Sequence, residues 1–415
     1  MSANKGNGNL PAGVLTLVLG ICLIITILVS SLIMLGYYYR MEHVRYDTMR
    51  QLRDNLYSAQ TYVQAYASSM SYSQKTSLDL WEKGIDSVHI GKQFWGLWDI
   101  FDVVAVKGQQ SDTLLFSLGF LPDTLGQSVL YVADDRRPIS IAGESRIVGT
   151  AYLPLSGIKS TYINQEGYSG DKLVYGDSKV SGAEMPPIQT ARLPLLEQAL
   201  RGEMEVLFPF MDSLSSSWRV YGRFGVEKGL GSMLVSGEVK HQVYWSDTLL
   251  QVSSGTRLTN CLLIAPKVEV FSDVKGDFQI LASEGVYIEE DVEMKYPSGI
   301  VVLSQSDSSA IKIERASIFG AIILYGPGKE LRNKEIHIEE GSLIKGLVFC
   351  DGMLDLQANV QGHVSTRKFY LKLRSSIFEN HLYNIQLRQD LPKAYLLSDF
   401  VGASDKAYVL KYLYK

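Results

Sequence analysis

The chain carries a strand-like unit that returns at regular intervals. The unit is an apolar residue, a spacer, a second apolar residue and a polar residue, as in "VYIEEDVEM". It begins at Val268, Val286, Ile311, Ile336 and Leu354, so the steps are 18, 25, 25 and 18 residues. One such unit cannot bury its apolar face alone, but stacked units share a continuous core. The spacing therefore predicts a mainly β fold with a β-solenoid (a parallel β-helix), in which a corner loop lengthens some coils.

Most repeats close with an apolar residue, any residue and a glycine. Glycine tolerates the positive φ that a corner requires. Two earlier segments, "ISIAGESRIVG" and "KLVYGDSKVSG", have the same pattern of apolar residues and glycine. This places the start of the solenoid near residue 136. We expect the following glycines at corners: Gly149, Gly182, Gly276, Gly320, Gly346 and Gly362.

Glu289, Glu314 and Glu339 follow the apolar pair in three successive repeats. Successive residues of a strand point to opposite faces. Because the apolar pair is assigned to the interior, these carboxylates are expected to point outward as a solvated edge. A stacked carboxylate site is the alternative interpretation.

The N-terminal region is apolar over a length that suits a membrane. No charged residue occurs from Gly6 to Tyr39, and the segment from Leu10 to Gly36 is long enough to cross a bilayer with some tilt. Three tyrosines and Arg40 follow it, as is typical of a membrane interface. We therefore predict a transmembrane helix over residues 10–37 that contacts the lipid bilayer, in preference to a cleaved signal peptide.

The helix is expected to continue beyond the span without a break, over roughly 55 residues and on the order of 80 Å. Apolar residues recur there at steps of mostly three and four, which predicts an amphipathic stalk over residues 38–70. This stripe either packs on the chain's own globular part or docks neighbouring subunits. It consists of Met41, Val44, Met49, Leu52, Leu56, Ala59, Val63 and Tyr66.

The orientation of the chain is indicated in two conflicting ways. Arg40, Arg45, Arg50 and Arg53 follow the span, against Lys5 before it, and the positive-inside rule then places the large domain in the cytoplasm. A domain of this size can nevertheless be translocated despite flanking charge. We favour an inner-membrane, single-pass protein with a periplasmic (extracytoplasmic) domain.

Changes in composition and residue pattern along the sequence predict eight segments. Residues 188–250 read as an inserted α+β module, with a helix from about Ile188 to Leu200 and hairpins after it. The expected division is 1–9 tail, 10–37 transmembrane helix, 38–70 stalk, 71–135 β-rich connector, 136–187 first solenoid coils, 188–250 inserted helix and hairpin module, 251–374 main solenoid and 375–415 C-terminal cap.

No motif predicts an active site, and we expect no enzyme, no catalytic residue, no cofactor and no metal. The six histidines are scattered, "GYSGD" is read as a tight turn, and the adjacent Asp134 and Asp135 make a poor catalytic pair because they point to opposite faces. Cys261 and Cys350 are interpreted as buried small residues, with a disulfide between them as the alternative. The net charge of -4 and the lack of a basic run argue against nucleic acid as a partner.

The N-terminal sequence "NLPAGVLTLVLGICLIITILVSSLIMLGYYYR" and the stalk after it resemble the N-terminal helix of minor pilins and pseudopilins of type IV pilus and type II secretion systems. The repeats are similar to bactofilin-type β-helices in coil length and in their glycine turns. The layout is also similar to membrane-anchored bacterial proteins with "AYLPLSG" and "GDKLVYGDSKVSG" segments, a likeness that implies no activity.

Three functions follow from these features. The first is a non-enzymatic, membrane-anchored structural or assembly protein of the bacterial envelope with an extracytoplasmic β-helix, such as a minor pilin-like or pseudopilin-like component of a type IV pilus or secretion-like system. Its partners would be other assembly subunits or copies of itself. The second is a bactofilin-like scaffold that faces the cytoplasm. The third is a β-helix that binds or modifies polysaccharide along one face.

Overall fold

The computed structural model describes the chain with several gaps. The described residues are 12–72, 74–80, 84, 86–119, 128–188, 192–203, 225–304, 308–326, 333–373, 376–391, 395, 398, 400 and 409–413. The predicted N-terminal tail, residues 204–224 of the predicted module and most of the last 16 residues of the predicted cap lie outside them.

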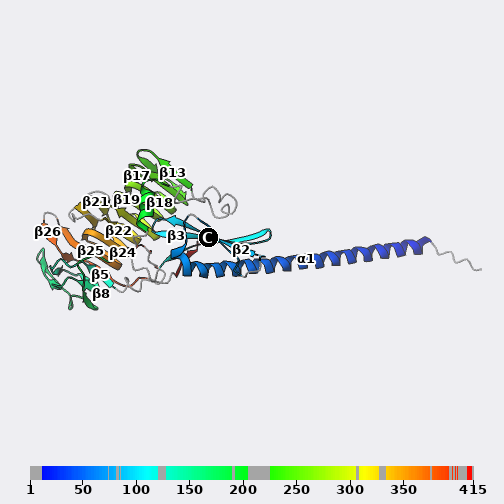
Figure 1. Ribbon diagram of the computed structural model, residues 1–415, viewed down its shortest axis with the longest axis horizontal. Coiled ribbons are helices and arrows are strands. Elements are labelled where there is room, and N and C mark those ends of the chain that lie inside the picture. Colours follow the sequence, from blue (N-terminus) through cyan, green and yellow to red (C-terminus); the bar gives the residue numbers. More distant parts are fainter. Residues whose placement is uncertain are drawn as a thin grey trace, which may run out of the picture.

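One long helix, α1 (Ala12–Tyr66), extends away from the β-rich part of the molecule (Figure 1). Its 55 residues confirm the predicted continuous helix. By length and composition it can cross a membrane, and its most apolar window is wholly exposed. Within this half the Thr26 hydroxyl donates to the carbonyl of Cys22 at 2.7 Å, so the helix itself satisfies a polar group that would otherwise face an apolar surrounding.

The second half of α1 packs on an antiparallel sheet. The sheet has the order β1-β2-β3-β4-β29. A short 3-10 turn, η1 (Ala67–Ser69), ends the helix before the chain enters this sheet. Its strands are β1 (Thr76–Leu78), β2 (Asp86–Trp95), β3 (Trp98–Lys107), β4 (Gln110–Gly119) and β29 (Val409–Leu413), so the predicted C-terminal strand is present and joins the predicted connector.

The amphipathic stripe of α1 is used in two ways. Leu52, Leu56, Ala59 and Val63 are buried in a cluster with the apolar face of β2, β3 and β4. This confirms the interpretation that the stripe packs on the chain's own domain. Met41, Val44 and Tyr66 remain 46%, 59% and 52% exposed, so the stripe is covered over only part of its length.

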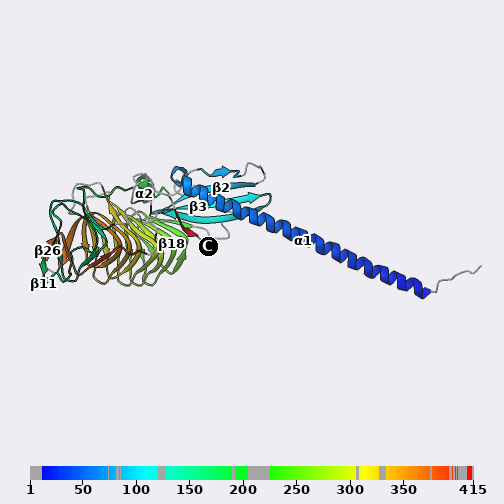
Figure 2. The same ribbon diagram turned by 90° about the horizontal axis from the view of Figure 1, so that it is seen from below.

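Most other strands pair parallel in one closed sheet, which we call the parallel stack (Figure 2). Short strands come first along the chain: β5 (Ser128–Val132), β7 (Arg146–Val148), β8 (Thr150–Leu153), β12 (Ser178–Val180), β13 (Gly225–Gly229), β14 (Met233–Val235), β15 (Glu238–Lys240), β16 (Gln242–Ser246) and β17 (Leu249–Val252). Longer strands dominate after them: β18 (Arg257–Val270), β19 (Lys275–Ile288), β20 (Glu293–Leu303), β21 (Ser309–Ile313), β22 (Ser317–Tyr325), β23 (Lys334–Ile338), β24 (Leu343–Leu356), β25 (Asn359–Leu373), β26 (Ser376–Glu379) and β28 (Gln386–Arg388).

Small elements complete the fold. The helix α2 (Leu193–Leu200) is shorter than the predicted one. A three-stranded sheet has the order β27-β6-β9, and a separate pair is β10-β11. These strands are β6 (Ile139–Ala142), β9 (Ile158–Ser160), β10 (Tyr162–Ile163), β11 (Glu166–Gly167) and β27 (His381–Tyr383).

The first residues of the sequence repeats are paired with one another in neighbouring strands. Val268 pairs with Val286, Val286 with Ile311, Ile311 with Ile336 and Ile336 with Leu354, all in parallel strands. The apolar residues of each repeat lie together in one buried apolar cluster that forms the interior of the stack. Glu289, Glu314 and Glu339 lie on the outside and are half-buried. The predicted pairing of the repeats is therefore confirmed.

The closing glycines occupy bends where one layer of strands touches the next. Gly276, Gly320, Gly346 and Gly362 have φ values of 146°, 156°, 138° and 140°. A Cβ on Gly346 would lie 1.8 Å from the carbonyl oxygen of Gly320, and its equivalents meet the same obstacle. Gly149, with φ 135°, fits the prediction as well. Gly182 does not, because it is exposed, its φ is not positive and nothing lies closer than 3.5 Å to a Cβ there.

The pairing of the strands shows how several of the predicted segments are arranged. β5 belongs to the predicted connector and pairs with β25, and β7 belongs to the first predicted coils and pairs with β28, so strands of both segments cover the far end of the stack. In the described part of residues 188–250, β13 to β15 pair parallel with β16 to β18, and the predicted hairpins are not formed.

Residues 376–388, which belong to the predicted C-terminal cap, pair directly with the last long strand, β25, through β26 and β28. β28 lies between β25 and β7, and Ile385 and Leu387 are buried in the common interior. The physical reason is that open strand edges must be covered, and here the chain's own earlier strands cover the far edge. The residue limits of the eight segments otherwise stay predictions.

Candidate functional site: a polar junction between sheet and stack

The tip of the β2–β3 hairpin lies against the outer face of the parallel stack. Trp95, Leu97 and Trp98 are buried there with apolar residues of β18 to β24 and α2. Gln279 of β19 binds the tip twice, because its Nε2 donates to the carbonyl of Trp95 at 3.0 Å and its Oε1 accepts from the amide of Leu97 at 2.8 Å. Gly96 between them has φ 61°, and a Cβ there would lie 2.5 Å from Gln279 Oε1. The backbone of the hairpin tip therefore packs directly against the side chain of Gln279 in the stack.

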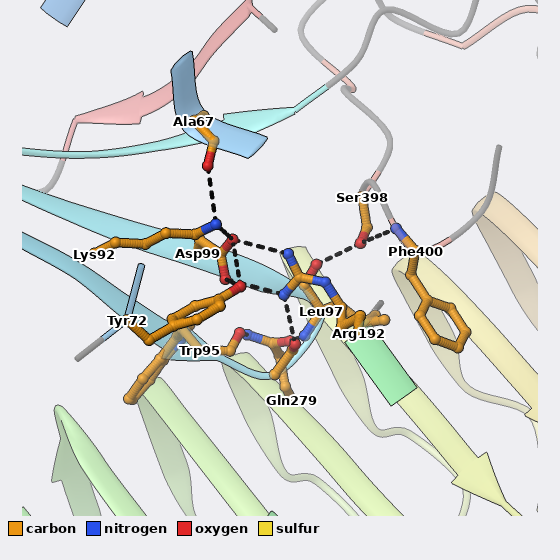
Figure 3. A network of polar contacts seen from close by, with 11 residues as sticks. Ala67, Tyr72, Lys92, Trp95, Leu97, Asp99, Arg192, Gln279, Ser398 and Phe400 are labelled. Carbon is orange, nitrogen blue, oxygen red and sulfur yellow. Dashed lines mark hydrogen bonds and ion pairs between the residues drawn. The ribbon is translucent and has the colours of Figure 1, made fainter. Parts of the chain in front are cut away.

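A buried carboxylate joins three parts of the chain beside this tip (Figure 3). Asp99 Oδ1 and Oδ2 accept from the two terminal nitrogens of Arg192 at 3.1 and 3.0 Å. Tyr72 donates its hydroxyl to the same carboxylate at 3.0 Å, and Lys92 Nζ lies 3.4 Å from it. Lys92 also donates to the carbonyl of Ala67 at the end of α1, at 3.0 Å. One carboxylate thus links the end of α1, the antiparallel sheet and the segment that leads into α2.

The charges of this cluster compensate one another. Asp99, Lys92 and Arg192 are only 7%, 7% and 4% exposed. Burial by itself raises the pKa of Asp99, but the charges of Arg192 and Lys92 outweigh it and hold the pKa below its ordinary value. A carboxylate that is ionised, paired and enclosed is poorly placed to transfer protons or to meet a substrate. The arrangement is suited to holding parts of the chain together.

The C-terminal region reaches the same place. Ser398 donates its hydroxyl to the carbonyl of Leu97 and accepts from the amide of Phe400 at 3.1 Å. Phe400 is fully buried in the same apolar cluster. The hairpin tip is therefore held from two sides, by β19 and by a segment that comes about 300 residues after it.

Asp102 is a second buried carboxyl on β3, the strand of Asp99, and its negative charge is less compensated by neighbouring positive charges. It is 1% exposed, and Lys75 Nζ lies 3.8 Å from its Oδ2. Burial raises the pKa of Asp102 to about 6, and Lys75 only partly opposes this. Its cross-strand neighbour is Gly91, where a Cβ would lie 2.0 Å from Asp102 Oδ1, so the glycine makes room for the carboxyl.

A serine and a histidine form a pair where the first strand of the stack meets β25. His363 Nε2 is 2.5 Å from the hydroxyl of Ser365, and Nδ1 is 2.7 Å from the carbonyl of Ser128. Serine and histidine are residue types that serve as a catalytic nucleophile and its general base. Ser365 and His363 are 0% and 2% exposed, however, and burial lowers the pKa of His363 to about 4. The pair ties β5 to β25, and an enclosed serine does not meet a substrate.

The other residues considered from the sequence are not brought together into a site. Asp134 and Asp135 accept from the amides of Arg136 and Arg137 at 2.8 and 3.0 Å, so each stabilises its own turn. In the described residues, no group of three or more His, Cys, Asp or Glu can hold a metal ion. Cys261 and Cys350 are buried free thiols without a disulfide, as the first interpretation predicts.

A shallow groove of about 710 Å³ runs along one corner of the stack. Lys267 and Glu284 form an ion pair of 3.4 Å at its edge. The lining offers charges and hydroxyls, and no aromatic ring for a sugar to stack on is among its described residues. These residues are Lys267, Glu284, Gly285, Ser308, Ser309, Ala310, Asn333 and Glu335.

Sequence reasoning missed the junction. Asp99, Arg192 and Gln279 lie far apart in the sequence and in no repeat, so spacing gives no sign that they meet. The segment "FWGLWD" was the available signal, because two tryptophans around a glycine mark a tight turn that must bury large apolar surface.

Comparisons with known proteins give little support for a family. No protein-family model matches the chain. No curated protein matches it. Among solved structures, the chain is similar to the competence-associated pilin ComZ from Thermus thermophilus, with 7% sequence identity over 83% of this chain and 86% of that chain and a TM-score of 0.28. The likeness is distant, and at this TM-score it carries no inference about this chain.

Proposed function

We propose that this protein is a non-enzymatic, membrane-anchored structural or assembly protein of the bacterial envelope. The free half of α1 lies in the bilayer, and the sheet and stack form an extracytoplasmic domain. The observation that carries the proposal is the division of one unbroken helix into an exposed apolar half and a half packed on its own sheet. A free apolar helix of this length needs lipid or other apolar partners around it.

The proposal extends to the architecture of the β-rich part. The parallel stack is a β-solenoid whose coils advance by 18 to 25 residues, in keeping with register pairs such as Val268 with Val286 and Val286 with Ile311. It is a rigid domain held at a fixed orientation to the helix by the junction around Asp99. Such a body on a membrane helix suits a minor pilin-like or pseudopilin-like subunit, with other envelope subunits or further copies as partners.

Topology tests this function most directly. A periplasm-active reporter fused after Lys415 should be active, and protease added to intact spheroplasts should digest the β-rich domain. A reporter that is active only in the cytoplasm, together with a protected domain, would rule the extracytoplasmic proposal out. Release of the chain from membranes by high salt alone would rule out the anchor.

A second function is favoured by the arginines that follow the apolar half. Arg40, Arg45, Arg50 and Arg53 lie on exposed positions of α1, and the positive-inside rule places such a segment in the cytoplasm. The protein would then be a bactofilin-like scaffold on the inner face of the membrane. The same reporter separates the two functions, because it gives opposite results for them.

A further inference from the structure

A small polar cluster lies between α1 and the end of the β2–β3 hairpin that faces away from the stack. Lys107 Nζ donates to Gln51 Oε1. Gln51 Nε2 and Asn55 Nδ2 donate to the same oxygen of Asp86, at 2.8 and 2.6 Å. Asn55 and Asp86 are only 1% and 6% exposed. Asp86 and Lys107 are cross-strand partners, so one end of the hairpin is bound to two residues one turn apart on the helix.

The apolar contact beside this cluster specifies the position along the helix only in part. A shift by one turn places Leu56 where Leu52 was and Val63 where Ala59 was, and it puts a polar residue, Gln60, only where Leu56 was. Apolar burial is non-directional and depends mainly on area. It therefore discriminates weakly between neighbouring positions of the helix on the sheet.

The polar cluster distinguishes strongly between neighbouring positions of the helix on the sheet. A one-turn shift in one direction places Asp47 at the position of Gln51, so a carboxylate replaces the bridge between Asp86 and Lys107 and repels Asp86. A shift in the other direction places Ala59 at the position of Asn55, and Asp86 loses a buried donor. In the native position one oxygen of Asp86 accepts from both Gln51 and Asn55, so a shift that removes one of these two buried donors is unfavourable.

We propose that Gln51, Asn55, Asp86 and Lys107 form a register lock that fixes where along α1 the antiparallel sheet docks. Together with the bond from Lys92 to the carbonyl of Ala67 at the end of the helix, the lock thereby sets how much of the helix extends free of the sheet. Buried polar contacts that fix register at some cost in stability are known from coiled coils. The inference concerns the packing of the helix and goes beyond the proposed function, since it holds whatever surrounds the free half.

The lock is tested by a distance along the helix in the full-length chain in detergent micelles. Nitroxide labels at Ser31→Cys on the free half and Ser111→Cys on β4 report the separation by pulsed electron paramagnetic resonance. Cys22→Ser removes the exposed native thiol. Cys261 and Cys350 stay unlabelled because they are buried, and burial raises the pKa of their thiols to about 11 and about 12.

Two variants and one control are compared with the parent. In the first variant, Gln51→Leu, Asn55→Leu, Asp86→Leu and Lys107→Met make the cluster apolar. In the second, Gln51→Ala, Asn55→Gln and Ala59→Asn move the two donors one turn along the helix. The control Ser58→Ala removes an exposed hydroxyl that bonds only to its own helix, to the carbonyl of Asp54.

The parent and the control should each give a single distance. The apolar variant should add a second population about 6 Å away, the rise of four helical residues. In the moved variant the main population itself should lengthen by about 6 Å. A single parental distance in both variants would overturn the lock. If the apolar variant does not fold, the moved variant decides alone, because it keeps the same polar groups.

Discussion

Apolar side chains line the interior of the parallel stack, whereas the junction between the stack and the antiparallel sheet buries Lys92, Asp99 and Arg192. The stack is stabilised by one arrangement repeated layer after layer, so each layer resembles its neighbours. The junction is stabilised by single contacts that occur once. This difference teaches where each region is sensitive: the stack to anything that disturbs the repeat, and the junction to any change in charge.

The largest effect is expected in the stack, at Gly346. Gly346→Ala forces a Cβ to within 1.8 Å of the Gly320 carbonyl oxygen at a φ of 138°. Strain at this φ and loss of the bonds between the layers together should destabilise the protein by about 4 kcal/mol or more. The midpoint of chemical unfolding of purified protein in detergent measures it.

Gly182→Ala is the matched control, because the sequence places Gly182 in the same motif while a Cβ there would make only an ordinary contact, 3.5 Å from the Tyr131 hydroxyl oxygen. It should change stability by less than about 0.5 kcal/mol. Equal effects of the two substitutions would show that the motif, and not the contact between layers, decides the cost.

The next effect belongs to the junction. Arg192→Met keeps much of the length of the side chain but leaves the buried Asp99 with only Lys92 and Tyr72. Breaking a buried pair on one side typically costs about 3 kcal/mol or more. Calorimetry or chemical unfolding measures it, and Arg201→Met serves as the control, because Arg201 pairs with Glu203 on the surface, where ion pairs contribute little. A loss as small as that of the control would contradict the assigned role.

These two effects also show how far the sequence predicts this structure. The repeat of Val268, Val286, Ile311 and Ile336 predicts which strands pair, because the same side-chain phase must return in every layer. The apolar run and the stripe predict α1 to within a few residues. Both signals are periodic, and a period can be read without knowing what the residues contact.

The order of the layers could not be read in this way. Whether β5 covers the far end of the stack or begins it depends on contacts such as Val364 with Leu130, which the period does not encode. The candidate site was invisible for the same reason, since Asp99 and Arg192 are 93 residues apart and belong to no pattern. Their meeting is decided by the whole fold.

A third prediction concerns pH and uses the contrast between two carboxyls of one strand. Asp99 is compensated, while the pKa of Asp102 is raised to about 6 from an ordinary value of 3.8. The folded state therefore binds the proton of Asp102 more tightly than the unfolded state does. The resulting stability is fully present below pH 3.8 and is lost as the pH rises through about 6.

Asp102→Asn should remove this dependence. At pH 8 the variant should be more stable than the parent by up to about 3 kcal/mol, and below pH 4 the difference should vanish. Chemical unfolding at several pH values measures both, with the exposed Asp54→Asn as the control. A constant difference between parent and variant across the range would mean that Asp102 does not titrate in the folded protein as its burial requires.

The smallest effect tests a second corner of the stack, where the repeat is imperfect. Asp273, Asp291 and Arg315 occupy successive positions of positive φ, at 57°, 61° and 32°. Asp and Asn tolerate this region, whereas arginine is strained in it. Arg315 also pairs with Glu290 on the surface, but the two side chains are 62% and 48% exposed, so that pair contributes little. Arg315→Asn should therefore stabilise the protein by up to about 1 kcal/mol in a careful unfolding comparison.

Arg257→Asn, at an exposed strand position whose φ is not positive, should bring no gain. A gain at Arg257 as large as that at Arg315 would attribute the effect to charge, and the strain at this corner would then be unimportant.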